Sequence, residues 1–197
     1  MSGKSKNVLK GLLVGVIVLL VIVSVGGSIA LHGNTIVAWW LPLTICGVMA
    51  LASATVLWRI WMRLTGSVSF FPNFICQAVF AWSLLLFGFY VTNYGFASEA
   101  SKHVEDVTVE GVYSKTHYKS RRVGRGRYVR GEPYKVYYME VSLADGRLKE
   151  LSVTRDESRR LRKGTVLPLT FERGFWGAPV IKRQGLHVDV PHSSYRP

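Results

Sequence analysis

The first half of this chain contains three stretches without a charged residue, at 11–31, 37–58 and 74–96. They have 21, 22 and 23 residues, and a helix needs about 20 apolar residues to cross roughly 30 Å of hydrocarbon. Inside a bilayer the backbone must satisfy its own hydrogen bonds, so even the β-branched run Val14–Val18 is expected to be helical. The sequence therefore predicts a transmembrane region of three helices over 11–96, after a basic N-terminal flank at 1–10.

The positions of Lys and Arg beside these stretches predict their orientation, because short cytoplasmic flanks carry an excess of basic residues. Three lysines precede the first stretch, none lies between the first and the second, and Arg59 and Arg63 follow the second. Residues 97–106 contain one Lys and three acidic residues. The pattern predicts a multi-pass cell-membrane protein with a cytoplasmic N-terminus and an extracytoplasmic C-terminal domain, which is periplasmic if the cell is Gram-negative.

Two alternatives stay open in this half. A cleaved signal peptide is the rival interpretation of the first stretch, and it would leave the C-terminal domain on the same side. Gly11 with Gly15, and Ala50 with Ala54, are pairs that let helices approach closely and form a helix-mediated oligomer. Chance in a Gly- and Ala-rich sequence is the alternative, and the favoured, explanation of both pairs.

Gln77 is expected to form a hydrogen bond between helices, which contributes about 0.6 to 2 kcal/mol in a bilayer. No ionisable residue lies deep within a stretch. Proton-coupled and ion-conducting transporters normally need such a residue. The sequence therefore argues against that class.

Beyond residue 104 the pattern changes to short strands, which predict a soluble β-rich domain at 104–184 and a flexible tail at 185–197. The expected strands lie at 106–118, 134–143, 148–153, 166–171 and 179–182. Five strands with a helix between the third and the fourth predict a membrane α + β protein. Its three transmembrane helices precede a small five-stranded OB-like or SH3-like β-barrel domain with one short helix.

Local motifs support these elements. Gly111 is expected to form a β-bulge, Asp145–Gly146 a hairpin turn, and Pro168 an edge strand. Thr154–Glu157 has the pattern of a capping box, which begins a helix that we expect to continue to about Lys163 and to end at Gly164. The expected inward side chains are Tyr137, Met139, Val141, Leu143, Leu167, Leu169 and Phe171.

The charges of the chain are segregated. All 12 acidic residues lie at or after Glu99, as do 20 of the 25 basic residues, so this part carries +8 of the formal net charge of +13. A strongly basic protein is expected to bind anionic partners. Cys46 and Cys76 both lie in apolar stretches, which excludes a disulfide framework in the soluble domain and leaves the redox compartment undetermined.

The stretch Lys119–Lys135 has seven basic residues against Glu132 alone, and it lies between the first two predicted strands. Its arginines suit bidentate contacts with phosphate or carboxylate, and Tyr128 and Tyr134 can stack on a ring. A solvated loop is the alternative, with or without contact to anionic lipid headgroups. A second cluster, from Arg155 to Lys163, lies on the short helix, where the helix dipole favours basic residues near the end. The candidate anion-binding or partner-binding residues are Lys119, Arg121, Arg122, Arg125, Arg127, Tyr128, Arg130, Lys135, Arg159, Arg160 and Arg162.

We expect no catalytic residues, no metal site and no cofactor. His187, Asp189 and His192 are possible ligands, but their spacing matches no specific metal site. No nucleophile elbow, P-loop, HExxH or CxxC motif is present.

The leading hypothesis is a noncatalytic membrane protein. It displays a basic extracytoplasmic β-barrel to an acidic protein, an anionic lipid or an envelope polymer. The alternatives are a cytoplasm-facing protein that binds nucleic acid through the same stretch, and a small transporter subunit or enzyme without a recognisable motif. The basic residues beside the predicted helices make nucleic acid the less favoured partner.

Overall fold

The computed structural model describes residues 3–124, 126–143 and 145–182, with side chains from residue 8 onward. The chain forms two compact units. The first contains residues 1–100 and 173–180, and the second contains residues 101–172 and the chain from 181 onward. The short segment Arg173–Val180 thus belongs with the helices, although it lies far from them in the sequence.

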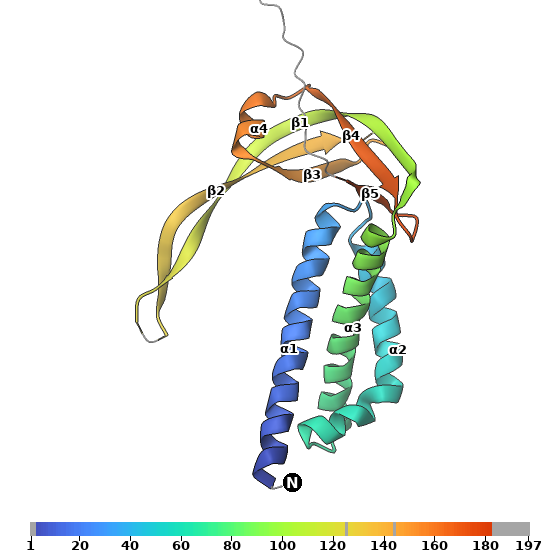
Figure 1. Ribbon diagram of the computed structural model, residues 1–197, viewed down its shortest axis with the longest axis vertical. Coiled ribbons are helices and arrows are strands. Elements are labelled where there is room, and N and C mark those ends of the chain that lie inside the picture. The colour runs from blue at the N-terminus through green and yellow to red at the C-terminus, as the bar shows by residue number, and fades with distance from the viewer. Residues whose placement is uncertain (1–2, 125, 144, 183–197) are drawn as a thin grey trace, which may run out of the picture. The chain divides into compact units, whose positions relative to one another are not determined.

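The first unit contains three long helices, α1 (Gly3–Gly33), α2 (Trp40–Thr65) and α3 (Phe70–Gly95), joined by short connections (Figure 1). All three are long and apolar enough to cross a membrane, which confirms the prediction of three apolar helices. Both α2 and α3 extend beyond the charge-free stretches, because a helix need not end where the hydrocarbon ends. Phe70 and Phe71 precede the predicted stretch 74–96 but form the first turn of α3 together with Pro72. Proline is tolerated there because the N–H groups of a first turn have no partner within the helix.

The helix α3 packs against both α1 and α2. On α2, Ala50 and Ala54 are buried, with exposed fractions of 1% and 0%. The pair Gly11 and Gly15 on α1 differs, because a Cβ added at either position would meet no atom within 4 Å. The close approach of α1 is at Gly27, where an added Cβ would lie 2.4 Å from the Phe87 ring of α3.

Polar side chains in this unit are paired with one another. The indole Nε1 of Trp61 donates to the Gln77 carboxamide oxygen at 2.6 Å, which confirms the expected hydrogen bond between helices. Asn73 is fully buried and closes the α2–α3 connection. Its amide donates to the carbonyls of Ser67 and Ser69, and its oxygen accepts from the Thr65 hydroxyl at 2.7 Å. These bonds satisfy groups that would be costly to leave unpaired in lipid.

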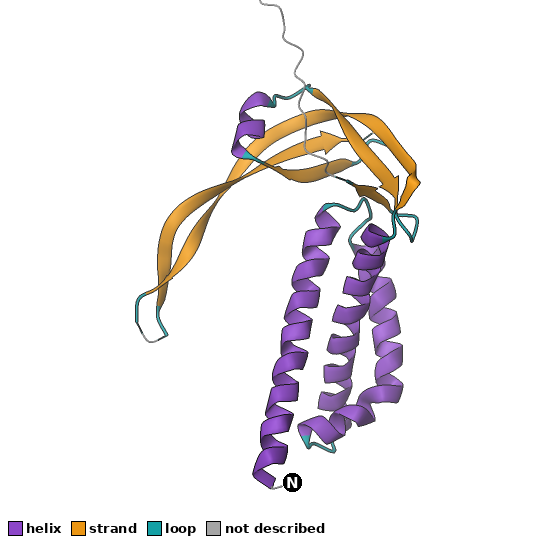
Figure 2. Cartoon of the chain, in the orientation of Figure 1, coloured by secondary structure: helices purple, strands orange, loops and turns teal. Residues whose placement is uncertain are grey.

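The five strands form one antiparallel sheet in the order β3-β2-β1-β4-β5, with the short helix α4 between β3 and β4 (Figure 2). Their bounds are β1 Ser98–Arg122, β2 Tyr128–Ser142, β3 Leu148–Val153, α4 Arg155–Arg160, β4 Val166–Arg173 and β5 Pro179–Ile181. The number of strands and the place of the helix agree with the prediction. The barrel does not, because the sheet of the described residues is open. Its edge strands β3 and β5 have six and three residues and are separated by three other strands.

One face of the sheet forms the core of the second unit. The buried apolar side chains include Val107, Val109, Met139, Val141, Leu143, Leu151, Val153, Leu161, Leu167, Leu169 and Phe171. This list confirms the inward assignments on β2 and β4, apart from Tyr137, which is half-buried. The expected bulge is present between Val109 and Gly111. It shifts the alternation by one residue, so that Val109 pairs with Val141 and Val112 with Met139.

Two local predictions need correction. The capping box is present, with Thr154 and Glu157 bonded reciprocally, but α4 ends at Arg160 because the buried Leu161 is extended. Gly164 does not end the helix. Its N–H donates to the Val109 carbonyl at 2.7 Å, so it joins the chain to the sheet.

Pro168 does not mark an edge strand, because β4 lies between β1 and β5. The short β5 is bonded to β4 through the Lys182 N–H and the Thr170 carbonyl. Pro168 lies two residues before that point and is exposed. Because β5 has only three residues, it does not need a hydrogen bond from position 168, where proline has no N–H.

Replacing Val141 with Asp should unfold the second unit. The side chain is fully buried. The free energy of unfolding of a typical domain is only about 5 to 15 kcal/mol. Burying an unpaired carboxylate, together with the loss of packing, is expected to exceed it. Limited proteolysis of the full chain in detergent should show rapid cleavage after residue 101 in Val141→Asp. The neighbouring Ser142→Asp, on the opposite face, should resist like the wild type, and equal sensitivity of both would contradict the assigned face.

Candidate functional site

The basic stretch Lys119–Lys135 is mostly strand rather than the loop expected from its sequence. Strand β1 continues to Arg122 and β2 begins at Tyr128, which is its partner across the hairpin. The pairing of β3 with β2 ends at Tyr137. On the other side, the backbone of Val109 in β1 forms hydrogen bonds with Gly164 and Thr165, just before β4. Residues 114–136 therefore form a narrow two-stranded ribbon beyond the body of the sheet (Figure 2), which we call the arm.

Contacts between its own side chains hold the arm together. Tyr113 and Tyr138 stack just before the arm, with 5.8 Å between ring centroids. Within the arm, His117 stacks on Tyr134 at 5.6 Å, and the Arg130 guanidinium lies 4.3 Å from the Tyr118 ring centroid. Cross-strand pairs of this kind contribute about 0.2 to 1 kcal/mol each. These contacts stabilise the pairing of the two strands where no hydrophobic core covers them.

Gly131 allows the two strands to approach closely near the tip. The pairing shifts register between Tyr118 and Ser120. A Cβ added at Gly131 would lie 2.7 Å from the Lys119 carbonyl oxygen. A shallow hollow forms at this irregularity. It is lined by Lys119, Ser120, Arg121, Arg122, Val123, Val129, Arg130, Gly131 and Glu132.

The basic side chains of the arm are exposed. Lys119, Arg121, Arg122, Arg127, Arg130 and Lys135 all point into solvent. Among the described residues, the ion pair that involves the arm joins Lys115 at its base to Glu150, and the ion pairs of Glu110, Asp145 and Glu172 lie outside the arm. The guanidinium of Arg122 donates to the Gly124 carbonyl at 3.2 Å, which leaves its remaining N–H groups available. The arm therefore presents several arginines whose charge is not neutralised by an acidic side chain of the described chain.

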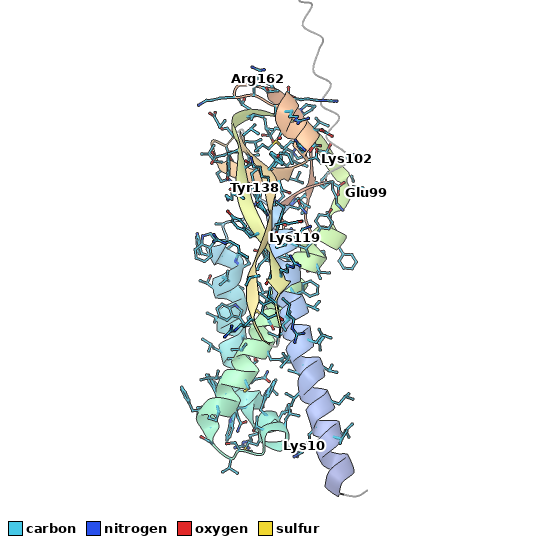
Figure 3. All side chains as sticks on the ribbon, turned by 90° about the vertical axis from the view of Figure 1, so that its left-hand side faces the viewer. Lys10, Glu99, Lys102, Lys119, Tyr138 and Arg162 are labelled. Carbon is cyan, nitrogen blue, oxygen red and sulfur yellow. The ribbon has the colours of Figure 1, made fainter. Side chains whose placement is uncertain are left out.

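The second basic cluster meets the arm only at its base. There a groove is lined by Lys135 and Tyr137 of β2 and by Thr154 and Arg155 at the start of α4. Arg159, Arg160 and Arg162 are exposed further along the chain. Figure 3 shows Arg162 well apart from Lys119. The two basic clusters therefore meet only at Lys135 and Arg155.

Sequence reasoning did not find a cluster around Lys115 at the base of the arm. The Lys115 ammonium lies 4.6 Å from the Tyr138 ring centroid and 3.2 Å from a Glu150 carboxylate oxygen. The Tyr113 hydroxyl also donates to Glu150. These hydrogen bonds, first from Tyr113 and then from Lys115, lower the pKa of Glu150. The strand register could have indicated this cluster. The turn at Asp145–Gly146 pairs Glu150 of β3 with Glu140 of β2, and Tyr113 lies on β1, on the other side of β2.

Some candidates lie outside the described residues, namely Arg125 and the possible ligands His187, Asp189 and His192. Within the described ranges, no group of three or more His, Cys, Asp or Glu side chains is placed to hold a metal ion.

A comparison of the chain with protein-family models, with curated proteins and with solved structures finds no match. The class is therefore defined by the geometry alone. It is a chain with three helices suited to membrane insertion, followed by an open antiparallel sheet that extends into a basic arm.

Order at the base of the arm should depend on the charge of Glu150. Because its pKa is lowered in the folded protein, its contribution is present above the ordinary value of 4.5 and is lost as the pH falls through the folded value. Hydrogen exchange, corrected for intrinsic rates, should show protection of residues 113–118 that is constant above about pH 5 and falls as the pH is lowered below the ordinary pKa of 4.5. Glu150→Gln should remove this dependence, whereas the control Glu132→Gln should keep it. An equal pH dependence in both variants would contradict the role of Glu150.

Proposed function

We propose that this chain is a noncatalytic multi-pass membrane protein that presents its basic arm to an anionic partner outside the cytoplasm. The partner is an acidic protein, an anionic lipid or an envelope polymer. The observation that carries the proposal is the outer part of the arm, from Lys119 to Lys135, a paired ribbon. Its described basic side chains are exposed and form no ion pair with an acidic side chain of the described residues.

The arm contributes little to the stability of the sheet. Its tip, from Lys119 to Lys135, lies outside the buried core and collects like charges that repel one another. A two-stranded ribbon is marginally stable in water by itself. An ordered ribbon with this charge gains most from an anionic partner, which offsets the repulsion and adds contacts along its length.

Arginine predominates over lysine at the tip, and this favours a partner with phosphate or carboxylate groups. The planar guanidinium forms two parallel hydrogen bonds with either group, whereas an ammonium acts as a point charge. Arg121, Arg122 and Arg130 all line the hollow near the tip of the arm. Several anionic groups on one partner can therefore be bound together.

The extracytoplasmic side is supported by the distribution of charge on the helices. The N-terminus and the α2–α3 connection lie at one end of the helical unit, and the end of α3 lies at the other (Figure 1). Lys10 lies near the first end, together with Arg59 and Arg63 in the last turns of α2 (Figure 3). By the positive-inside rule this end is cytoplasmic. The sheet domain follows α3 and is therefore assigned to the opposite side.

Replacing Arg121, Arg122, Arg125 and Arg127 with Ser should weaken binding of the full chain to anionic vesicles or to a copurifying partner. Stability should change by less than about 0.5 kcal/mol per site at Arg121, Arg122 and Arg127, because these side chains are exposed. Removing four positive charges should also reduce the salt dependence of binding. Cosedimentation with vesicles across a salt series, and pull-down of the partner, measure both effects.

The matched control removes four charges from the other cluster, by replacing Arg155, Arg159, Arg160 and Arg162 with Ser. It should bind nearly as well as the wild type if the arm carries the attraction. Lysine at the four arm positions should preserve a diffuse contact with lipid and impair a bidentate site. If the arm variant with serine binds as tightly as the wild type at low salt, the arm is only a solvated hairpin.

A further inference from the structure

The segment Arg173–Val180 returns from the sheet to the helical unit and is fixed there by Asn93, in the last turn of α3. The Asn93 side chain is fully buried. Its amide donates to the Ala178 carbonyl at 3.1 Å, and its oxygen accepts from the Trp176 backbone N–H at 3.0 Å. The Asn93 side chain thus forms hydrogen bonds with two backbone groups of the turn.

The sequence of the turn fits this clamp. Gly174 donates its N–H to the Ala178 carbonyl, and a Cβ at this position would lie 2.4 Å from the Asn93 carboxamide. Gly177 has a φ of +81°, which favours glycine. Both glycines of the Gly174–Gly177 turn therefore have a structural cause.

A second set of bonds fixes the end of the segment to the α1–α2 connection. The Ile36 N–H donates to the Pro179 carbonyl at 2.8 Å, and the fully buried Thr35 forms a β-bridge with Val180. The turn is thereby attached at both ends to the same end of the helical unit.

The turn holds large aromatic side chains, yet it leaves them exposed. The Trp176 indole donates to the Thr92 hydroxyl at 2.8 Å, and its ring stacks on Phe89 with 6.2 Å between centroids. The Phe175 ring contacts Trp176 at 5.0 Å and Phe96 at 6.2 Å. Even so, the exposed fractions are 58% for Trp176, 61% for Phe175 and 68% for Phe96.

We propose that the Gly174–Gly177 turn is an anchor in the membrane interface, with Phe96, Phe175 and Trp176 among the lipid headgroups. The 26 residues of α3 span about 39 Å at 1.5 Å per residue. This exceeds the roughly 30 Å of hydrocarbon, so the ends of α3 lie in the headgroup region. Aromatic side chains with a polar group, tryptophan above all, are favoured there. The bilayer that α3 crosses is therefore the surface that covers this cluster.

The anchor gives the C-terminal domain a second attachment to the bilayer. The chain leaves the helical unit after residue 100 and returns to it at 173–180. Without the anchor, the covalent link that follows α3 would be the attachment. The inference holds for either side of the membrane, so its success or failure is separate from that of the proposed function.

Depth measurement by electron paramagnetic resonance tests the anchor in the full chain reconstituted in phosphatidylcholine vesicles. Cys46 and Cys76 are replaced by Ala, and a spin label is attached to a cysteine at position 175. Collisions with oxygen and with a water-soluble nickel complex report its depth. Leu51, near the middle of α2 and 51% exposed, supplies the hydrocarbon reference, and free label supplies the aqueous one.

The label at 175 should lie between the two references, at headgroup depth. In Asn93→Ala the clamp is lost, and the label should become more accessible to nickel, whereas Gln77→Ala should leave its depth unchanged. A label at 175 that is as accessible to nickel as free label would show a turn that packs on α3 but remains in water, and would overturn the proposal. An unchanged depth in Asn93→Ala would overturn the role of the clamp.

Discussion

The carboxamide of Asn93 fixes the segment Arg173–Val180 to the helical unit. A buried amide without partners costs several kcal/mol in an apolar environment. Asn93 finds its partners in backbone groups more than 80 residues away, at Trp176 and Ala178. The connection between β4 and β5 must therefore return to the end of α3. Asn73 and Gln77 satisfy the same requirement within the α2–α3 hairpin.

The elements that could be predicted are those with a local signal. Absence of charge marked the three helices, and alternation marked the inward faces of β2 and β4. A bulge, a hairpin turn and a capping box were each visible in a few residues. Asn93 could not be found in this way, because its partners are backbone groups that any residue supplies. Whether the sheet is open or closed depends on which distant strands pair, and the sequence of a single strand does not indicate its partners.

The arm shows why the candidate site was predicted only in part. Its residues were identified by their charge, but glycine and arginine are typical of loops, and so a loop was expected. Cross-strand contacts, such as Arg130 on Tyr118 and His117 on Tyr134, extend the pairing instead. These contacts depend on the register beyond the bulge at Gly111. The resulting ribbon displays its charges in a fixed arrangement, which suits a partner with several anionic groups.

We propose that α3 delivers the sheet and its arm to the extracytoplasmic side. Labelling of intact cells or spheroplasts with an impermeant maleimide tests it, using single cysteines in a background without Cys46 and Cys76. Ser152→Cys lies at an exposed position of β3, and Val68→Cys lies in the α2–α3 connection at 88% exposure. We expect labelling of Ser152→Cys in intact cells and of Val68→Cys only after rupture of the membrane. The reverse pattern would place the arm in the cytoplasm and contradict the proposed orientation.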